Sequence, residues 1–285
     1  MKTLSGKIAI VGGGSRGAAR GIALALGDAG ATVYIAARTS RNGPKPADGA
    51  PGTVEDTAEE VAARGGVAIP VRTDLADDAQ VEALFRRVSE EQGRLDILTN
   101  SAWGADFMPV WSTPYWKLGS QIWRDTLDTM NTYWQTTVHA TSLMQKSGGG
   151  IIIHVTDNYP VDVSAYRGQI LHDVAHEFIN RLVRGLGKDA KKAKVAIVGL
   201  NPGFMRTERV VMAMKTEEIK KQFRFDRSES VEFIGRAAVA LAADPKVIRK
   251  SGELLWAADL ADEYGFTDTD GKVPRFDYSA VACCS

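Results

Sequence analysis

Short apolar runs alternate with stretches of helical periodicity along all 285 residues, and this alternation constrains the fold more than any other feature. Parallel strands need a crossover connection, which is usually a helix, so the alternation predicts a parallel sheet. We expect one α/β domain over residues 1–285, with a doubly wound, seven-stranded parallel sheet and helices on both faces. The predicted strands are Ile8–Val11, Thr32–Ala36, Val67–Val71, Leu95–Leu98, Ile151–Val155, Val195–Leu200 and Glu253–Trp256.

Charge and composition argue against several kinds of partner. The 35 Lys and Arg residues balance the 35 Asp and Glu residues, so no net charge favours nucleic acid or an acidic membrane surface. No apolar stretch near the N-terminus is long enough for a signal peptide or a spanning helix. Cys283 and Cys284 are neighbours in the tail and indicate neither a disulfide framework nor a metal site. We therefore expect a cytoplasmic protein that acts on a small molecule.

A glycine-rich turn joins the first predicted strand to the first predicted helix. It reads Gly-Gly-Gly-Ser-Arg-Gly from residue 12 to residue 17. Glycines permit a tight turn and a close backbone approach to a pyrophosphate, which the N-terminus of the following helix also favours. The alternative is a turn that only lets the helix pack closely on the sheet. The pattern favours dinucleotide binding, with contacts from Gly13, Ser15, Arg16 and Gly17.

This turn resembles that of the short-chain dehydrogenase/reductase family, whose motif is T-G-x-x-x-G-x-G. Gly12 stands at the Thr position, Gly13 and Gly17 match, and Ala19 replaces the last Gly. The resemblance covers nearly the whole chain and implies a Rossmann fold with a nicotinamide cofactor. Segments such as Arg20–Ala23, Gly93–Asp96 and Asp259–Gly265 resemble the branch of dehydrogenase/reductase family member 1. That branch implies NADPH-dependent carbonyl reduction with broad apolar substrates.

The end of the second predicted strand bears on the choice of cofactor. An acidic residue there selects NAD by bonding the adenosine ribose, but Ala37 stands at the family's position for it. Arg38, Ser40 and Arg41 follow, and Arg16 lies in the glycine turn. Arginines suit a 2′-phosphate through charge-assisted hydrogen bonds, whereas the alternative is that they are simply solvated. We therefore predict NADP(H).

Other segments match the family's cofactor-binding pattern, and the resemblance implies a role for each. Asp74 and Leu75 resemble its adenine-contacting pair, and Asn100 begins its N-N-A-G segment, in which Trp103 takes the place of the glycine. Asn131 lies in the long predicted helix, where the family has a proton-relay asparagine. The turn that contacts the nicotinamide carboxamide is matched by Pro202, Gly203 and Thr207.

The family's catalytic Ser, Tyr and Lys are absent at the matching positions. Asp157 falls at the serine position, just after the fifth predicted strand. The family's tyrosine usually lies 30 residues before the proline of the nicotinamide turn. Counting back from Pro202 places His172 at the tyrosine position and His176 at the lysine position. No Tyr-x-x-x-Lys occurs elsewhere in the sequence.

The substituted histidines are open to several interpretations. A histidine can replace a tyrosine acid, because its unperturbed pKa of about 6.5 lies near neutrality, and Asp157 or Asp173 would orient it. His176 is a shorter substitute for lysine, and a phenol such as Tyr159 is an alternative acid. The segment H-D-x-x-H also resembles a zinc motif, with a third ligand from His154, Asp157 or Glu177, but we predict no metal. The remaining alternative is a vestigial cleft.

Aromatic residues gather beyond the fourth predicted strand. Trp103, Trp111 and Tyr115, together with Tyr159, are placed to line an apolar substrate pocket, although core packing explains other members of the cluster. We expect an NADP(H)-linked oxidoreductase that acts on a carbonyl or alcohol of a bulky apolar or aromatic substrate, with His172 as acid. The alternatives are a non-redox lyase, dehydratase or isomerase using His172 and Asp157, and a cofactor-binding pseudoenzyme. The resemblance implies a homodimer or homotetramer through helices near residues 120–146 and 170–190.

Overall fold

The computed structural model describes residues 2–46, 48–103, 113–157 and 170–275. Seven parallel strands form one sheet in the order β3-β2-β1-β4-β5-β6-β7, which confirms the predicted doubly wound α/β fold. Their bounds are β1 Ile8–Gly12, β2 Thr32–Ala37, β3 Val67–Arg72, β4 Ile97–Asn100, β5 Gly150–Val155, β6 Val195–Asn201 and β7 Leu254–Trp256.

The fourth strand begins two residues later than the sequence predicts. Asp96 directly precedes this strand. The Asp96 carboxylate accepts one hydrogen bond from the backbone N–H of Ile8 and one from the ammonium group of Lys7, each at 3.0 Å. This carboxylate ties the entry of β4 to the start of β1. Leu95 is fully buried, but it lies ahead of the ladder, so burial of an apolar residue extended the predicted strand too far.

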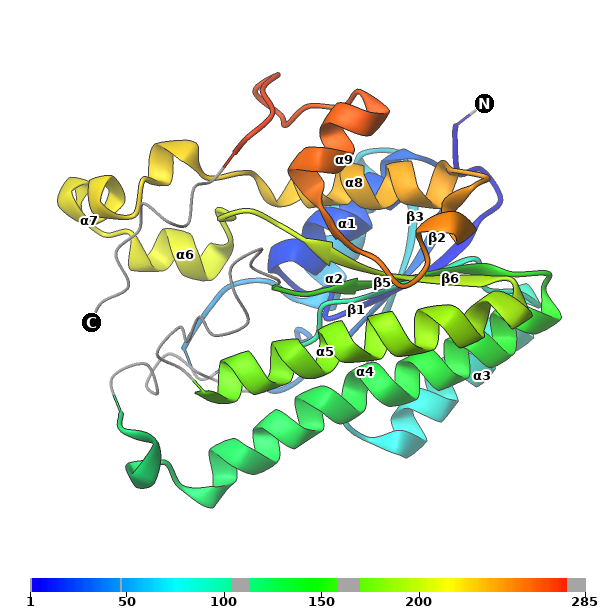
Figure 1. Ribbon diagram of the computed structural model, residues 1–285, viewed down its shortest axis with the longest axis horizontal. Coiled ribbons are helices and arrows are strands. Elements are labelled where there is room, and N and C mark those ends of the chain that lie inside the picture. The colour runs from blue at the N-terminus through cyan, green and yellow to red at the C-terminus, as the bar shows by residue number, and fades with distance from the viewer. Residues whose placement is uncertain (1, 47, 104–112, 158–169, 276–285) are drawn as a thin grey trace.

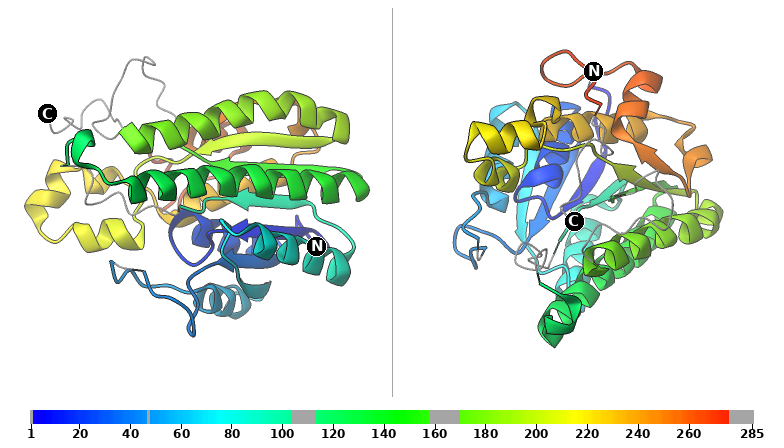
Figure 2. Two further views of the ribbon diagram at one scale, coloured as in Figure 1. Left: turned by 90° about the horizontal axis from the view of Figure 1, so that it is seen from below. Right: turned by 60° about the vertical axis from the view of Figure 1, so that its left-hand side comes forward.

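Helices cover both faces of the sheet (Figures 1 and 2). Alternate strand residues face the two layers: Ala9 and Val11 pack with α1, α2, α8 and α9, whereas Ile8 and Ile10 pack with α3, α4 and α5. The helices are α1 Gly17–Asp28, α2 Val54–Ala63, α3 Asp78–Gln92, α4 Ser120–Lys146, α5 Ile170–Asp189, α6 Glu208–Ala213, α7 Glu217–Gln222, α8 Val231–Ala243 and α9 Ala257–Tyr264. Within the described residues, no helix is long and apolar enough to span a membrane.

Two helices on one face touch through glycines. A Cβ added at Gly21 of α1 would lie 1.7 Å from the carbonyl oxygen of Val231 in α8, and one at Gly235 would lie 2.5 Å from the carbonyl oxygen of Gly21. Any side chain at either position would therefore push α1 away from α8. This close contact fixes the helix that follows the glycine turn.

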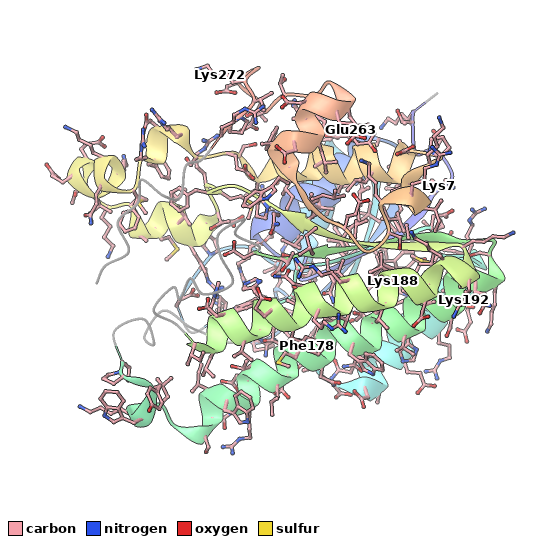
Figure 3. The ribbon with its side chains drawn as sticks, viewed as in Figure 1. Lys7, Phe178, Lys188, Lys192, Glu263 and Lys272 are labelled. Atoms are coloured by element: carbon pink, nitrogen blue, oxygen red, sulfur yellow. The ribbon has the colours of Figure 1, made fainter. Side chains whose placement is uncertain are left out.

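The carboxyl ends of the inner strands lie level with one another. The strand register sets Ala36, Gly12, Asn100, His154 and Gly199 side by side across the sheet. The loops after these strands and the short helix α6 therefore gather at one end of the molecule, on the left in Figure 1. In an open α/β sheet this end is where ligands bind. Lys188 and Lys192 lie at the opposite end of α5 (Figure 3).

Candidate active site and cofactor cleft

A cavity of about 600 Å³ lies at this end of the sheet. Its volume is in the range of small-molecule and cofactor sites. The glycine turn, the ends of β2, β3 and β4, the helix α4 and the segment after β6 all contribute to its walls. The predicted residues that line it are Gly13, Ser15, Arg16, Gly17, Arg38, Asp74, Leu75, Trp103 and Thr207.

The glycine turn is tight because the end of β4 lies against it. Gly13 has a φ of +84°, and a Cβ there would lie 2.9 Å from the backbone of Ala102 and from the carbonyl oxygen of Ser101. Its N–H donates to the carbonyl oxygen of Ala36 at 2.8 Å. Only glycine fits at such a point, since a side chain would collide with backbone that cannot move aside. These contacts leave bare backbone exposed to the cavity at Gly13.

At the end of the cavity beside β2, an uncharged residue is flanked by two cationic side chains. Ala37 ends β2 and is buried, while Arg38 and Lys45 line the space around it. Arg41 does not take part, because its guanidinium bonds Asp56 at 2.7 Å and Glu59 at 2.5 Å on α2. Of the two arginines predicted after β2, the structure thus brings one to the cavity and ties the other to a neighbouring helix.

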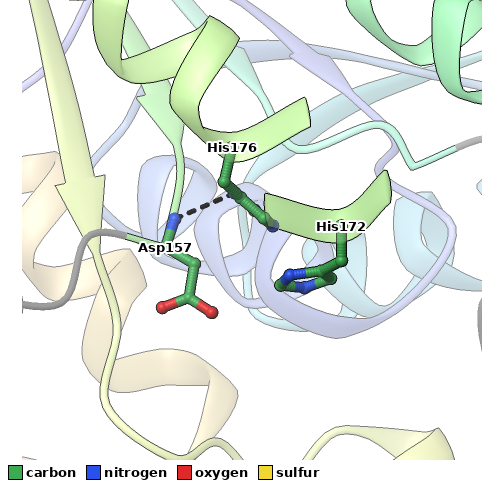
Figure 4. Close-up of side chains that lie close together, drawn as sticks. All are labelled: Asp157, His172 and His176. Carbon is green, nitrogen blue, oxygen red and sulfur yellow. Dashed lines mark hydrogen bonds between the residues drawn. The ribbon is translucent and has the colours of Figure 1, made fainter. Parts of the chain in front are cut away.

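The three residues predicted to replace the family's Ser, Tyr and Lys lie together (Figure 4). Asp157 follows β5, and His172 and His176 lie one turn apart near the start of α5. The histidine ring centroids are 4.4 Å apart, and ligand-type atoms of all three residues lie within 4.8 Å of one another. The backbone N–H of Asp157 donates to Nδ1 of His176 at 3.0 Å. The neutral ring of His176 therefore carries its proton on Nε2.

Trp103 lies between the cavity and these histidines. Its indole stacks on the His176 ring with centroids 4.7 Å apart and planes 16° apart, and its centroid lies 5.4 Å from that of His172. It also belongs to a small apolar cluster with Leu171, Leu118 and Ile122. Trp103 lines the cavity, whereas Asp157 and the two histidines are not among its lining residues. The indole thus covers the predicted catalytic row.

Asp157, His172 and His176 lie close enough together to hold a metal ion, but one ring nitrogen of His176 is already engaged. A neutral imidazole binds a metal through the nitrogen that carries no proton, and in His176 that nitrogen accepts the amide of Asp157. The other ligands considered from the sequence lie elsewhere. His154 is buried in the core with Nε2 3.0 Å from Oγ1 of Thr137, and burial lowers its pKa to about 3. Glu177 accepts a hydrogen bond from Asn180.

The family profile described as short chain dehydrogenase matches residues 7–218. The chain belongs to the short-chain dehydrogenase family. Dehydrogenase/reductase SDR family member 1 from Homo sapiens is 31% identical over 98% of this chain and 88% of its own length. The protein of that name from Mus musculus is 32% identical over the same shares.

Solved structures of the family share the fold. A short-chain dehydrogenase from Mycobacterium thermoresistibile has a TM-score of 0.80 at 22% identity, covering 95% of this chain and 92% of that one. A 7α-hydroxysteroid dehydrogenase complexed with NADH and 7-oxo glycochenodeoxycholic acid has a TM-score of 0.67 at 22% identity, covering 96% and 97%. At this identity the likeness establishes the fold.

Asn131 does not lie where the short-chain dehydrogenase pattern was expected to put it. Its side chain is exposed and donates to Oδ1 of Asp78 on α3 at 3.3 Å. Two residues earlier on α4, Thr129 is 1% exposed and lines the cavity. Two residues correspond to about 200° of helix rotation, so Asn131 lies on the face of α4 opposite to the one that lines the cavity.

Other predicted site residues lie outside the cavity. Asn100 is buried, and its amide donates to Oγ1 of Thr136 at 2.9 Å, so it ties β4 to α4 beneath the segment that does line the cavity. Tyr115 is 69% exposed, in a 3₁₀ turn where its ring meets Trp116, and it does not line the cavity. This corrects its prediction as a pocket residue. Trp111 and Tyr159 lie outside the described residues.

The predicted nicotinamide turn is held by a carboxyl group that the sequence analysis missed. Oε2 of Glu229 accepts the N–H of Gly203 at 3.0 Å, and the backbone of Glu229 pairs with Phe204 and Arg206 at 2.8 Å each. Burial raises the pKa of Glu229 to about 8. Pro202 and Gly203 themselves are not among the lining residues, whereas Met205 and Thr207 are. Glu229 therefore holds the backbone of this turn in place without itself lining the cavity.

Proposed function

We propose that this short-chain dehydrogenase is an NADP(H)-linked oxidoreductase that acts on a carbonyl or alcohol of a bulky apolar or aromatic substrate. The observation that carries the proposal is the continuous cavity that runs from Ala37, Arg38 and Lys45 to Trp103, whose indole stacks on His176 and lies next to His172. The neutral floor and cationic walls suit a 2′-phosphate, and the indole provides an apolar end.

The residues present fit the cofactor. Gly13 and Gly17 would hold its pyrophosphate, Asp74 and Leu75 its adenine, and Arg38 with Lys45 its 2′-phosphate. When bound, the nicotinamide supplies or accepts a hydride. His172 donates the proton to the carbonyl oxygen in reduction and removes it in oxidation. His176, whose Nδ1 is held by the amide of Asp157, keeps a fixed orientation next to it.

Trp103 defines how an apolar substrate would approach His172. Its indole now makes the contacts with both histidine rings. A substrate with a flat apolar group would replace or extend this stacking, because aromatic pairs favour the same separations of about 4.5–7 Å. We infer that Trp103 moves aside, or stacks on the substrate, before proton transfer takes place.

Cofactor preference is the first test. Removal of the guanidinium in Arg38→Ala should weaken NADPH binding about 10- to 100-fold, the value of a charge-assisted hydrogen bond, and leave NADH binding unchanged. Arg41→Ala is the matched control, because Arg41 is already engaged by α2 and should not affect either nucleotide. Fluorescence titration measures all affinities. Equal, weak binding of NADPH and NADH by the wild type would refute the assignment.

The role of His172 is the second test. His172→Ala should lower turnover about 10²- to 10⁴-fold and leave NADPH affinity nearly intact, because the residue acts on the proton and not on the cofactor. His139→Ala is the control, since that ring stacks on Phe85 between α3 and α4. Carbonyl-dependent oxidation of NADPH is the measurement. An undiminished rate in His172→Ala would remove this histidine from the mechanism.

A non-redox reaction is the second candidate, and Asp157 favours it. A carboxylate at the family's serine position disfavours a developing alkoxide, whereas serine would donate a hydrogen bond to it. Asp157 with the histidine pair instead forms a proton-transfer group suited to a lyase, dehydratase or isomerase. Product formed without any change in NADPH absorbance, and lost in His172→Ala, would establish this alternative. NADPH binding without any turnover would indicate a pseudoenzyme.

A further inference from the structure

A carboxylate of this chain occupies the phosphate-binding turn. Glu208 is the first residue of α6, and its Oε2 accepts the backbone N–H of Gly17 at 2.8 Å. Its other oxygen lies 3.8 Å from the guanidinium of Arg20. Gly17 is the first residue of α1, whose N-cap Arg16 makes no side-chain capping bond. The N-terminus of α1 is thus capped by an acid from a segment about 190 residues away along the chain.

This N–H is one that a dinucleotide would use. The first N–H groups of a helix have no partner within the helix, and they attract anions. In a strand-turn-helix of this kind the pyrophosphate sits at that helix N-terminus. Glu208 lines the same cavity as Gly13 and Gly17. The carboxylate therefore stands where a phosphate oxygen would be bound.

The next residue holds α6 to the other side of the cleft. Nε of Arg209 lies 2.5 Å from Oδ2 of Asp48, in the loop after β2. That loop is tied to the glycine turn by Arg16, which donates to the carbonyl oxygens of Pro51 and Gly52. The start of α6 is therefore fixed across the cleft at two points, one of them the phosphate-binding turn.

We propose that Glu208 is an affinity-determining residue that competes with the cofactor's pyrophosphate for the turn, a proposal that rests on the nucleotide-binding function above. A carboxylate and a phosphate cannot accept the same N–H, and two anions at that distance repel each other. Nucleotide binding must therefore displace the Glu208 side chain from Gly17. The displacement lowers the apparent affinity for any ligand that places a phosphate there.

The test compares the wild type with Glu208→Gln by isothermal titration calorimetry. The amide keeps the size of the side chain and removes its charge, so NADP⁺ and inorganic pyrophosphate should both bind about 10-fold more tightly. Adenosine 2′-monophosphate lacks the pyrophosphate and should bind both proteins equally. Glu217→Gln is the control for net charge, because Glu217 lies on α7 and pairs with Lys220. Glu208→Ala repeats the comparison with a side chain that cannot accept the N–H of Gly17 at all, and thermal melting checks that this variant is folded.

The outcomes separate this proposal from the proposed function. If both Glu208 variants bind NADP⁺ and pyrophosphate no more tightly than the wild type does, Glu208 is only a helix cap and the proposal is wrong. An equal gain in Glu217→Gln would also overturn it. If no protein binds NADP⁺ but pyrophosphate binds more tightly to the Glu208 variants, the nucleotide function fails and the role of Glu208 stands.

Discussion

His176 shows how a single backbone contact limits the chemistry of a side chain. Its Nδ1 accepts the amide of Asp157, so the neutral ring offers a proton on Nε2. The ring is also covered by Trp103 and is only 8% exposed. His176 is therefore suited to hold its neighbour His172 in place. A lysine at this position would add a mobile cation, which the short imidazole does not supply.

The buried carboxyl of Glu229 makes stability depend on pH. Its pKa is raised to about 8 by burial, with Asp268 nearby adding to the shift and Arg206 opposing it. Between about pH 4.5 and pH 8 the unfolded chain loses this proton while the native protein keeps it, so the free energy of unfolding falls as the pH rises. Ionisation of this group should cost on the order of 4 kcal/mol at pH 9.

Glu229→Gln removes the ionisation and keeps an oxygen for the N–H of Gly203. We expect the variant to melt at a higher temperature than the wild type at pH 9, and to show a flatter melting profile between pH 5 and pH 9. Thermal unfolding followed by circular dichroism measures both. Glu253→Gln, at an exposed position, serves as the control. A wild-type profile that is already flat would show that Glu229 is not protonated at neutral pH.

Single residues could be predicted from the sequence where the backbone determines them. The glycine turn and the Asp74–Leu75 pair line the cavity because their positions follow directly from the strand ends. Asn131 lies outside the cavity, since the direction of its side chain depends on the rotation of a long helix about its axis, which the sequence pattern does not fix. Glu208 and Glu229 were missed because their partners lie far away in the sequence.

At the scale of elements, α4 presents an apolar stripe to solvent. Four large side chains recur at helical spacing on its outer face and are between 41% and 49% exposed, namely Trp123, Leu127, Trp134 and Val138. The helix α5 lies beside it (Figure 2). An exposed apolar stripe of this kind marks an interface, and a two-fold axis would pair it with its own copy. We propose that the chain forms a homodimer or homotetramer through α4 and α5.

A charge in the middle of this stripe should prevent assembly. Leu127→Glu combined with Trp134→Glu should shift the protein to monomers, because two like charges would meet their copies across the interface. Size-exclusion chromatography with light scattering gives the mass. Val67→Glu is the matched control, since Val67 is 57% exposed on β3, away from α4. A wild type that is monomeric at high concentration would show that the stripe has another role.

The strands were predictable for a physical reason that the short helices do not share. In β1, β2, β4, β5 and β6 nearly every residue is buried, whereas β3 and β7 are partly exposed. The apolar pattern of each strand is local, and the predicted bounds of all seven agree within two residues. The helices α6 and α7 have six residues each and no buried residue, so their sequence shows no apolar stripe. The contacts of Glu208 and Arg209, with partners far away in the sequence, define the position of α6.

The whole molecule has no net charge, yet its cleft has a defined electrostatic pattern. Arg16, Arg38, Lys45 and Arg209 contribute cations to the cavity walls. Asp74, Asp125, Asp128 and Glu208 contribute carboxylates to the same walls, and Arg209 pairs with Asp48 in the loop after β2. The net charge of the sequence is zero and therefore gives no indication of this local arrangement of charges. The cleft is assembled from loops separated by most of the chain, so its charge emerges only once the sheet has brought the strand ends together.

The intact scaffold predicts that carbonyl reduction can be increased by giving Asp157, His172 and His176 the residues that the family uses. The glycine turn, the cavity and the turn predicted to contact the nicotinamide are all present. The combined change Asp157→Ser, His172→Tyr and His176→Lys would add the catalytic residues that the family uses. Trp103 covers this row. We therefore expect little gain from the triple change and a larger gain when Trp103→Gly, the family's residue at this position, is added.

The decisive measurement is NADPH oxidation with a panel of aromatic and aliphatic ketones. The rate of NADPH oxidation by the quadruple variant should exceed that of the triple variant about 10-fold or more. Without the indole, the phenol introduced by His172→Tyr can reach the carbonyl oxygen of the substrate and donate its proton. Trp103→Gly alone is the control for uncovering the site: it should bind NADPH as the wild type does, and its rate, with His172 still the acid, is the baseline against which the quadruple variant is compared. If the triple variant is already as active as the quadruple variant, Trp103 does not block the site and moves freely in solution. If neither variant is active although both bind NADPH, the cleft does not position a carbonyl substrate for reduction, and the non-redox function of Asp157 and His172 becomes the better account.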